Sequence, residues 1–154
     1  MAAPTTVQSM SGATLAISAA LPATYDAAGY GATTMVYTLI GSIENFGNHG
    51  VSGTISTFTD VATATVTKVK GAKDYGTMSL SLGSIPSDAG QALLDTAAES
   101  TNRYSVKMTY PSGAIHYMDV LVAKAEFNDG QVNDIQKRNV DLAICRKPVV
   151  IAAV

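Results

Sequence analysis

The sequence is short of charge, cysteine and tryptophan. Only 14% of its 154 residues are Asp, Glu, Lys or Arg, whereas charged residues make up about a quarter of an ordinary soluble domain. Its single cysteine, Cys145, excludes an intrachain disulfide and a cysteine-based metal site. We therefore expect one domain, stabilised by a packed core that a chain of this length can bury without a cross-link.

Long apolar runs and basic patches are also missing. No stretch approaches the roughly 18 uninterrupted apolar residues of a membrane-spanning helix, so membrane insertion is not expected. The first residues lack a basic segment followed by a continuous apolar run, so they do not indicate a secretion signal. A net charge of −2 argues against a dedicated nucleic-acid-binding protein, which normally carries a basic patch.

Residues that could catalyse a reaction or bind a metal do not occur in a spacing that indicates a site. His49 lies in an expected loop and His116 in a distant expected strand, and no cysteines accompany them to complete a zinc site. An isolated loop histidine such as His49 is usually incidental. His116 and Asp119 fall on opposite faces of their strand and cannot act as a base and its orienting carboxylate. Nucleotide-binding, serine-hydrolase and zinc-protease motifs are absent, and we expect no enzymatic activity, cofactor or metal.

A strand followed by a helix is the clearest structural unit. From 76 to 83, Met and Leu alternate with Thr and Ser, which predicts a strand with one buried and one solvated face. The helix is expected to begin after Pro86 with Ser87 as its N-cap and to end near Asn102. Its Ala and Leu residues recur every three or four positions, which gives it one apolar face. Gly90 is a local weakness in this helix.

Most of the remaining chain is predicted to be strand or loop. Further strands are expected at 14–20, 34–46, 60–69, 103–110, 114–127 and 138–145. Pro111-Ser112-Gly113 is typical of a hairpin turn, and Asn128-Asp129-Gly130 of another. The glycine-rich segment 47–58 is expected to be a long hairpin loop that reaches away from the body, and 22–33 a second loop.

Both ends of the expected single domain, 1–154, differ from its body. Residues 1–12 are small and uncharged and are expected to form an N-terminal arm. Residues 147–154 form a C-terminal tail that is apolar after Pro148, so it must pack on a neighbouring molecule or back on the domain.

Charge is most depleted in the first part of the chain, where no Lys or Arg precedes Lys68. A monomer is normally kept soluble by a mixed charged surface, so this segment suggests a surface covered by other copies of the chain. The alternative is that Ser and Thr keep the surface soluble, as in many secreted β-proteins. Composition alone does not separate the two.

Three segments in this order resemble the tail tube protein, or major tail protein, of long-tailed non-contractile bacteriophages. They are TLIGSIENFG after the arm, then KGAKDYGTMSLSLGSIPSDAGQALLDTAA, then YPSG with a long strand, a glycine turn and VDLAIC before Pro148. The resemblance covers about residues 34–150. It implies a mainly β fold, a β-sandwich or barrel with one flanking α-helix, shared with the tubes of type VI secretion systems and contractile tails.

The resemblance also implies a function as a structural virion protein. Such proteins form hexameric rings that stack into a hollow tail tube, through which DNA passes during delivery. Its partners would be other copies of itself, the tape measure protein and the tail terminator, and it would be made in the cytoplasm of the host bacterium and reside in the tail of the virion.

Candidate contact and lumen residues follow from the same resemblance. The arm, the 47–58 loop and the tail are the candidates for contacts between subunits and between rings, with Gly47, His49, Val51, Ile55, Phe58, Val149, Val150 and Ile151 as the residues. A lumen that lets DNA slide needs acidic or neutral polar side chains. The candidates are Glu44, Asp60, Thr63, Thr65 and Thr67, whereas Lys68 and Lys70 in the same expected strand do not fit a lumen lining.

Two other functions stay open. A tube subunit of a type VI or contractile-tail system would differ in partners and not in fold. A carbohydrate-binding or adhesin-like β-sandwich would need exposed aromatic residues along one face, but tryptophan is absent and the seven tyrosines are scattered.

Overall fold

The computed structural model describes residues 7–153 and consists mainly of β-strands. The strands are β1 (Thr14–Ser18), β2 (Thr38–Ile40), β3 (Ile43–Asn45), β4 (Ser52–Thr59), β5 (Val66–Asp74), β6 (Thr77–Gly83), β7 (Tyr104–Thr109), β8 (Ile115–Asn128), β9 (Lys137–Ile144) and β10 (Val149–Ile151). The helices are α1 (Ala27–Tyr30) and α2 (Ala89–Glu99). The predicted mainly β fold class is confirmed, and half of the expected N-terminal arm, residues 1–6, lies outside the described residues.

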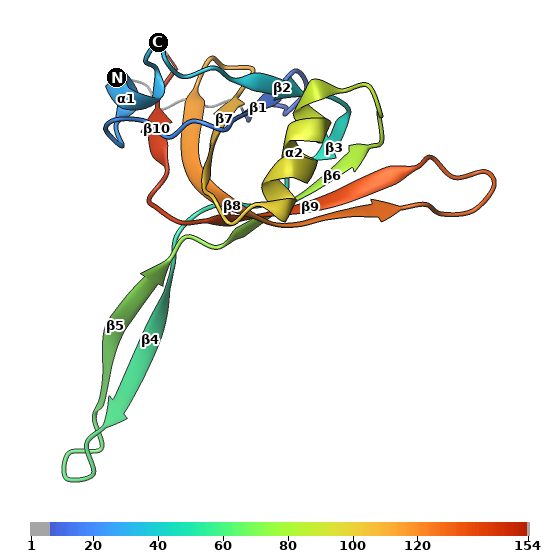
Figure 1. Cartoon of the computed structure of the whole chain (residues 1–154). Helices are drawn as coiled ribbons and strands as arrows, with labels where there is room; N and C mark the ends of the chain where they lie inside the picture. Colours follow the sequence, from blue (N-terminus) through green and yellow to red (C-terminus); the bar gives the residue numbers. More distant parts are fainter. Residues whose placement is uncertain (1–6, 154) are drawn as a thin grey trace.

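One antiparallel sheet forms the body of the molecule (Figure 1). Its strand order is β2-β1-β7-β8-β9-β6-β3, and β10 also pairs with β8. The two outermost strands, β2 and β3, are joined by Gly41 and Ser42 alone, so the two edges of the sheet come together at this corner. The sheet is therefore rolled into a barrel-like body.

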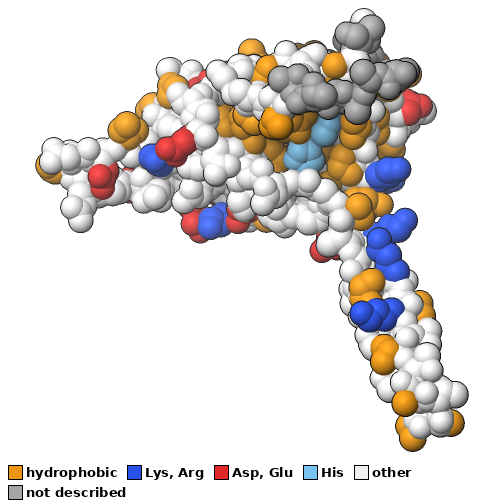
Figure 2. All heavy atoms as spheres, turned by 180° about the vertical axis from the view of Figure 1, so that it is seen from behind, with side chains coloured by type: hydrophobic (Ala, Val, Ile, Leu, Met, Phe, Trp, Pro, Cys, Tyr) orange, Lys and Arg blue, Asp and Glu red, His pale blue; other side chains and the backbone are white. Residues whose placement is uncertain are grey.

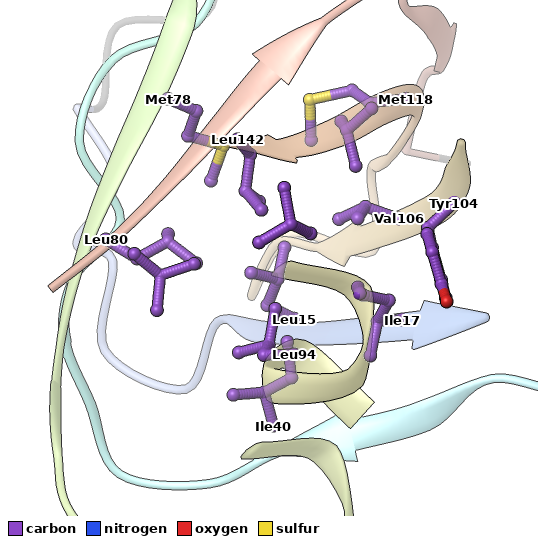
Figure 3. Close-up of a cluster of buried hydrophobic side chains, with 14 of the residues drawn as sticks. Leu15, Ile17, Ile40, Met78, Leu80, Leu94, Tyr104, Val106, Met118 and Leu142 are labelled. Atoms are coloured by element: carbon purple, nitrogen blue, oxygen red, sulfur yellow. The ribbon is translucent and has the colours of Figure 1, made fainter. Parts of the chain in front are cut away.

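A single cluster of buried apolar side chains fills the inside of the rolled sheet (Figure 3). On β6, Met78, Leu80 and Leu82 are buried, whereas Thr77 and Ser79 are exposed, which confirms the predicted alternation. β9 shows the same alternation, and the predicted hairpin of β7 and β8 is present. Leu94 of α2 points into the cluster, so the helix closes one side of the core.

Helix α2 starts one residue later than predicted and ends three residues earlier. Its N-cap is Asp88, whose carboxylate accepts a hydrogen bond from the backbone N–H of Gln91 at 2.9 Å. The same carboxylate accepts from the backbone N–H of Gly41 at 3.2 Å. Asp88 caps the helix in place of Ser87 because it joins α2 to the corner between β2 and β3.

Gln91 completes this connection from inside the protein. Its side chain is buried, and its Nε2 donates to the carbonyl oxygens of Gly41 at 3.2 Å and Gly83 at 2.8 Å. Its Oε1 accepts from the backbone N–H of Ile85 at 3.1 Å. One amide thus satisfies three backbone groups that the sheet leaves without a partner at the end of β6 and at the β2–β3 corner.

Gly90 allows the helix to approach β2 closely. A Cβ at this position would lie 2.2 Å from the carbonyl oxygen of Leu39 and 2.8 Å from the Cα of Ile40. The glycine that weakens the helix when the sequence is considered alone is therefore required by the packing of the helix against the backbone of β2.

We predict that Gly90→Ala lowers the free energy of unfolding by about 2 kcal/mol or more, because backbone atoms must move to admit the methyl group. Helix propensity alone predicts the opposite sign, a gain of about 1 kcal/mol. Urea denaturation measures the difference. Gly50→Ala is the matched control, since a Cβ there meets nothing within 4 Å, and its effect should stay below about 0.5 kcal/mol. A Gly90→Ala protein as stable as the original would show that the contact is unimportant.

Four predicted elements are wrong in their extent. The expected strand 34–46 is two short strands, because Ser42 adopts a positive φ of 57° and turns the chain between them. Part of the expected loop 47–58 is strand β4, and part of the expected strand 60–69 is a turn. The expected loop 22–33 contains the short helix α1, which Asp26 caps by accepting from the N–H of Gly29.

Candidate functional site

Strands β4 and β5 form a hairpin that projects from the body and pairs with no other strand (Figure 1). Its register runs from Ser52 opposite Asp74 to Thr59 opposite Val66. Every residue of the two strands except Gly53 is exposed. An isolated two-stranded hairpin is only marginally stable in water. Contact with another molecule would therefore stabilise this one.

The turn of the hairpin explains why the predicted strand 60–69 is wrong. Asp60 accepts hydrogen bonds from the backbone N–H of Ala62 at 3.0 Å and from the hydroxyl of Thr63 at 2.7 Å, and these bonds hold its pKa below the usual value. Ala64 adopts a positive φ of 53°. The alternating Thr and Val residues therefore do not continue as one strand, although their residue types favour one.

Apolar side chains are exposed along the whole hairpin. They are Val51, Ile55, Phe58, Val61, Val66 and Val69. Phe58 is 67% exposed although it is one of the largest apolar side chains of the chain. Figure 2 shows such side chains spaced along the hairpin. So many exposed apolar side chains on one projecting element make the hairpin the candidate interaction surface of the chain.

Gly47 and His49, the first two predicted contact residues, lie at the root of this hairpin. Gly47 has a positive φ of 67°, and a Cβ there would lie 2.3 Å from the carbonyl oxygen of Ser79, so the glycine packs the chain against β6. His49 is half-buried and contacts His116. The prediction that His49 stands alone in an exposed loop is therefore wrong, because the fold brings the two histidines together.

The two histidines lie beside Tyr110. Nε2 of His49 and Nδ1 of His116 are 2.9 Å apart, and the Tyr110 hydroxyl is 3.5 Å and 3.4 Å from these atoms. Burial lowers the pKa of both histidines and raises that of Tyr110. Asp119 lies elsewhere, where it accepts hydrogen bonds from Arg103 and Arg146.

The C-terminal tail packs back on its own domain. Strand β10 pairs antiparallel with β8, with Val149 opposite Tyr117 and Ile151 opposite Ile115. Val149 and Ile151 are half-buried, but Val150 is 60% exposed. Of the three predicted contact residues in the tail, Val150 thus presents the most surface to a neighbour.

The predicted lumen residues fall into two places. Asp60, Thr63, Thr65 and Thr67 lie on the hairpin, the first two in direct contact. Glu44 lies on β3 of the body, where Nζ of Lys137 donates to both of its oxygens at 2.8 Å and lowers its pKa. The structure of one chain does not bring these residues to a common surface.

Five basic residues of the body are engaged in ion pairs, whereas Lys107, Lys147 and the lysines of the β4–β5 hairpin have none within residues 7–153. Arg103 and Arg146 pair with the buried Asp119. Burial raises the pKa of Asp119, although the two arginines act in the opposite direction. The other body pairs are Lys124 with Glu126 and Asp141, Lys137 with Glu44, and Arg138 with Asp95. Within residues 7–153, Lys68, Lys70 and Lys73 on β5 have no acidic partner, and Figure 2 shows basic side chains where the hairpin leaves the body.

A second hairpin, at the opposite end of the body, is acidic. The outer part of the β8–β9 hairpin, residues 126–136, is exposed throughout and carries Glu126, Asp129 and Asp134 without any Lys or Arg. Phe127, Val132 and Ile135 on it are exposed as well. The chain thus presents two exposed hairpins that both carry apolar side chains and that differ in the sign of their charge.

Residues 7–153 contain neither a three-residue metal-binding group of the usual ligand types nor a membrane-spanning helix. No three His, Cys, Asp or Glu side chains in this part of the chain are grouped so as to hold a metal ion. In the same residues, no helix is long and apolar enough to cross a membrane.

Comparison with solved structures identifies the fold. No family model and no curated protein sequence matches the chain. A chain of the anti-feeding prophage baseplate matches with a TM-score of 0.70 and 10% identity, over 99% of both chains. A chain of the PVC sheath/tube terminator, from an extracellular contractile injection system, matches with 0.64 and 9%, over 97% of this chain and 100% of that one. The SPP1 tail tube matches with 0.60 and 10%, over 90% and 75%.

The chain has the fold of these tube, terminator and baseplate chains. At this level of identity the likeness concerns the fold alone. The likeness covers nearly the whole chain, so the matched region includes both projecting hairpins as well as the rolled sheet.

We predict that the double substitution Phe58→Ser/Val69→Ser changes the free energy of unfolding by less than about 0.5 kcal/mol, because both side chains are exposed and pack on nothing in the body. Thermal and urea denaturation test this. As a contrast, Leu80→Ala in the core should cost about 2–5 kcal/mol. A large loss of stability in the double variant would mean that the hairpin serves the fold of the single chain.

Proposed function

We propose that this protein is a structural subunit that assembles with other copies of itself into stacked hexameric rings, which form the hollow tail tube of a long-tailed bacteriophage. The observation that carries the proposal is the β4–β5 hairpin, which exposes apolar side chains away from the body and pairs with no other strand of its own chain. The fold shared with tail-tube and injection-system chains supports it.

Ring formation would cover apolar surface at the corner where the sheet closes. β2 and β3 are the two edge strands of the sheet, and each pairs on one side only. Val36 and Leu39 beside this edge are 72% and 62% exposed. Pairing between subunits would remove unpaired edges and bury these side chains, worth about 25 cal/mol per Å² of apolar area.

Stacking of rings would bring the two hairpins of opposite charge together. The lysines of β5 project from one end of the subunit and the acidic segment 126–136 from another. If the β4–β5 hairpin of one copy reaches the β8–β9 hairpin of a copy in the next ring, the lysines of β5, which have no acidic partner in the single chain, gain one. Identical subunits can make such a head-to-tail contact repeatedly, which yields a filament.

We also propose that DNA passes through the lumen of the tube, as the sequence resemblance implies. Glu44, Asp60, Thr63, Thr65 and Thr67 are acidic or neutral polar, as a lumen for DNA requires. In the phage tail the tape measure protein and the tail terminator would be partners, and the mature tube would lie in the virion.

The runner-up function is a tube subunit of a contractile system, favoured by the matches to chains of an extracellular contractile injection system. It differs from the first proposal in having a sheath around the tube, so electron microscopy of tubes purified from the source particle, with or without a surrounding sheath, would separate the two. A carbohydrate-binding function is not supported by the aromatic residues, since Tyr30, Tyr104 and Tyr117 are buried.

We predict that replacing residues 52–74 by a short Gly/Ser linker leaves a folded protein that no longer forms tubes. The ends of the deleted hairpin, Ser52 and Asp74, lie opposite each other in register, so the linker need not strain the body. Negative-stain electron microscopy and light scattering after size exclusion measure assembly, with the original protein as the control. Tubes of normal width from the deletion variant, or a monomeric original protein at high concentration, would contradict the proposal.

A charge exchange tests the proposed contact between hairpins. Lys68→Glu/Lys70→Glu/Lys73→Glu should weaken assembly at low salt, and so should Glu126→Lys/Asp129→Lys, because each places like charges opposite each other. A protein that combines all five substitutions should assemble again. Failure of the combined protein, while each set alone leaves the subunit folded, would show that the two hairpins do not meet.

A further inference from the structure

His49, His116 and Tyr110 gather three potential metal-binding atoms at the root of the projecting hairpin. The two histidines are the only ones in the chain. His49 precedes β4, His116 lies on β8, and Tyr110 directly follows β7. All three side chains are half-buried. Figure 2 shows the histidines together in a hollow among hydrophobic side chains. We propose that this cluster is a binding site for a divalent transition-metal ion, such as Zn²⁺.

The distances between the three atoms fit a single metal ion. The two nitrogens are 2.9 Å apart, and the tyrosine oxygen is 3.4 Å and 3.5 Å from them. In a tetrahedral zinc site with bonds of about 2.0–2.1 Å, neighbouring ligand atoms are about 3.3 Å apart. The triangle therefore needs shifts of only a few tenths of an ångström to surround one ion on three sides.

The protonation of the cluster suits a metal as well. A histidine binds metal through a neutral ring nitrogen, and burial favours the neutral form of both rings. Without metal, the short N–N distance is that of a hydrogen bond in which one ring donates to the other. With metal, each ring carries its hydrogen on the nitrogen that faces away, His49 on Nδ1 and His116 on Nε2. Tyr110 binds through its hydroxyl oxygen, and the metal lowers the pKa that burial raises.

The fourth ligand position opens to the hollow next to the histidines. This hollow has a volume of about 440 Å³, and Lys70, Lys73 and Lys147 line it together with Tyr75. The ammonium groups disfavour a second cationic ligand and favour water, hydroxide or a small anion at the open position. They also reduce the affinity for the ion, so we expect weaker binding than in a closed structural zinc site with four protein ligands.

Metal binding would fix the direction of the hairpin. His49 is three residues before the start of β4, whereas His116 belongs to the body, so an ion shared by the two links the root of the hairpin to β8. This link does not require assembly, and the proposal stands or falls separately from the function as a tube subunit.

Zinc binding to untagged protein tests the site. Equilibrium dialysis against Zn²⁺ should give one ion per chain, and Co²⁺ in its place should give the visible absorption of a four-coordinate ion. His49→Asn and His116→Asn should each weaken binding at least tenfold, and Tyr110→Phe by a smaller factor. Cys145→Ser is the control for binding by the exposed thiol and should bind as the original protein does.

A spectroscopic measurement on the unsubstituted protein guards against variants that fail to fold. The ring signals of both histidines in the NMR spectrum should shift together and saturate at one equivalent of Zn²⁺. Unchanged signals, binding well below one ion per chain, or binding that His49→Asn leaves intact in a folded protein would overturn the proposal.

Discussion

The fold depends on the closure of the sheet by the first turn of α2. Asp88 and Gln91 supply side-chain partners for backbone groups of Gly41, Gly83 and Ile85, which lie where the sheet turns back on itself. Gly90 lets the helix backbone approach β2 to the distance that these hydrogen bonds require. Leu94, one turn later, then fills the interior. A short helix can therefore fix both edges of the sheet, since the polar contacts position it and the apolar ones bury it.

Closure of the body determines which side chains stay free to contact other molecules. Ion pairs such as Lys137 with Glu44 and Arg138 with Asp95 are made within the body. The hairpin β4–β5 takes no part in the core or in these pairs, and it holds unpaired lysines and exposed apolar residues. The low charge of the N-terminal part of the sequence follows the same division, because that segment forms both edge strands of the sheet, β2 and β3, and one strand of the hairpin, β4.

Local patterns in the sequence predicted the elements that local chemistry determines. The alternation in β6, the Pro-Ser-Gly turn between β7 and β8 and the apolar face of α2 require only neighbouring residues. The turn at Asp60 was missed because no glycine or proline marks it, and Thr and Val on both sides favour a strand. The pairing of His49 with His116, the role of Gly90 and the cap at Asp88 depend on contacts between distant segments, which periodicity does not encode.

The hairpin β4–β5 is also the segment that acquires a stable structure last. Its two strands pair only with each other, so opening the hairpin in a lone subunit costs much less free energy than unfolding the body. A neighbouring molecule that covers the hairpin supplies the missing surface. Folding of this segment and association then become one event, and amide hydrogens that exchange quickly in the free chain become protected when the contact forms.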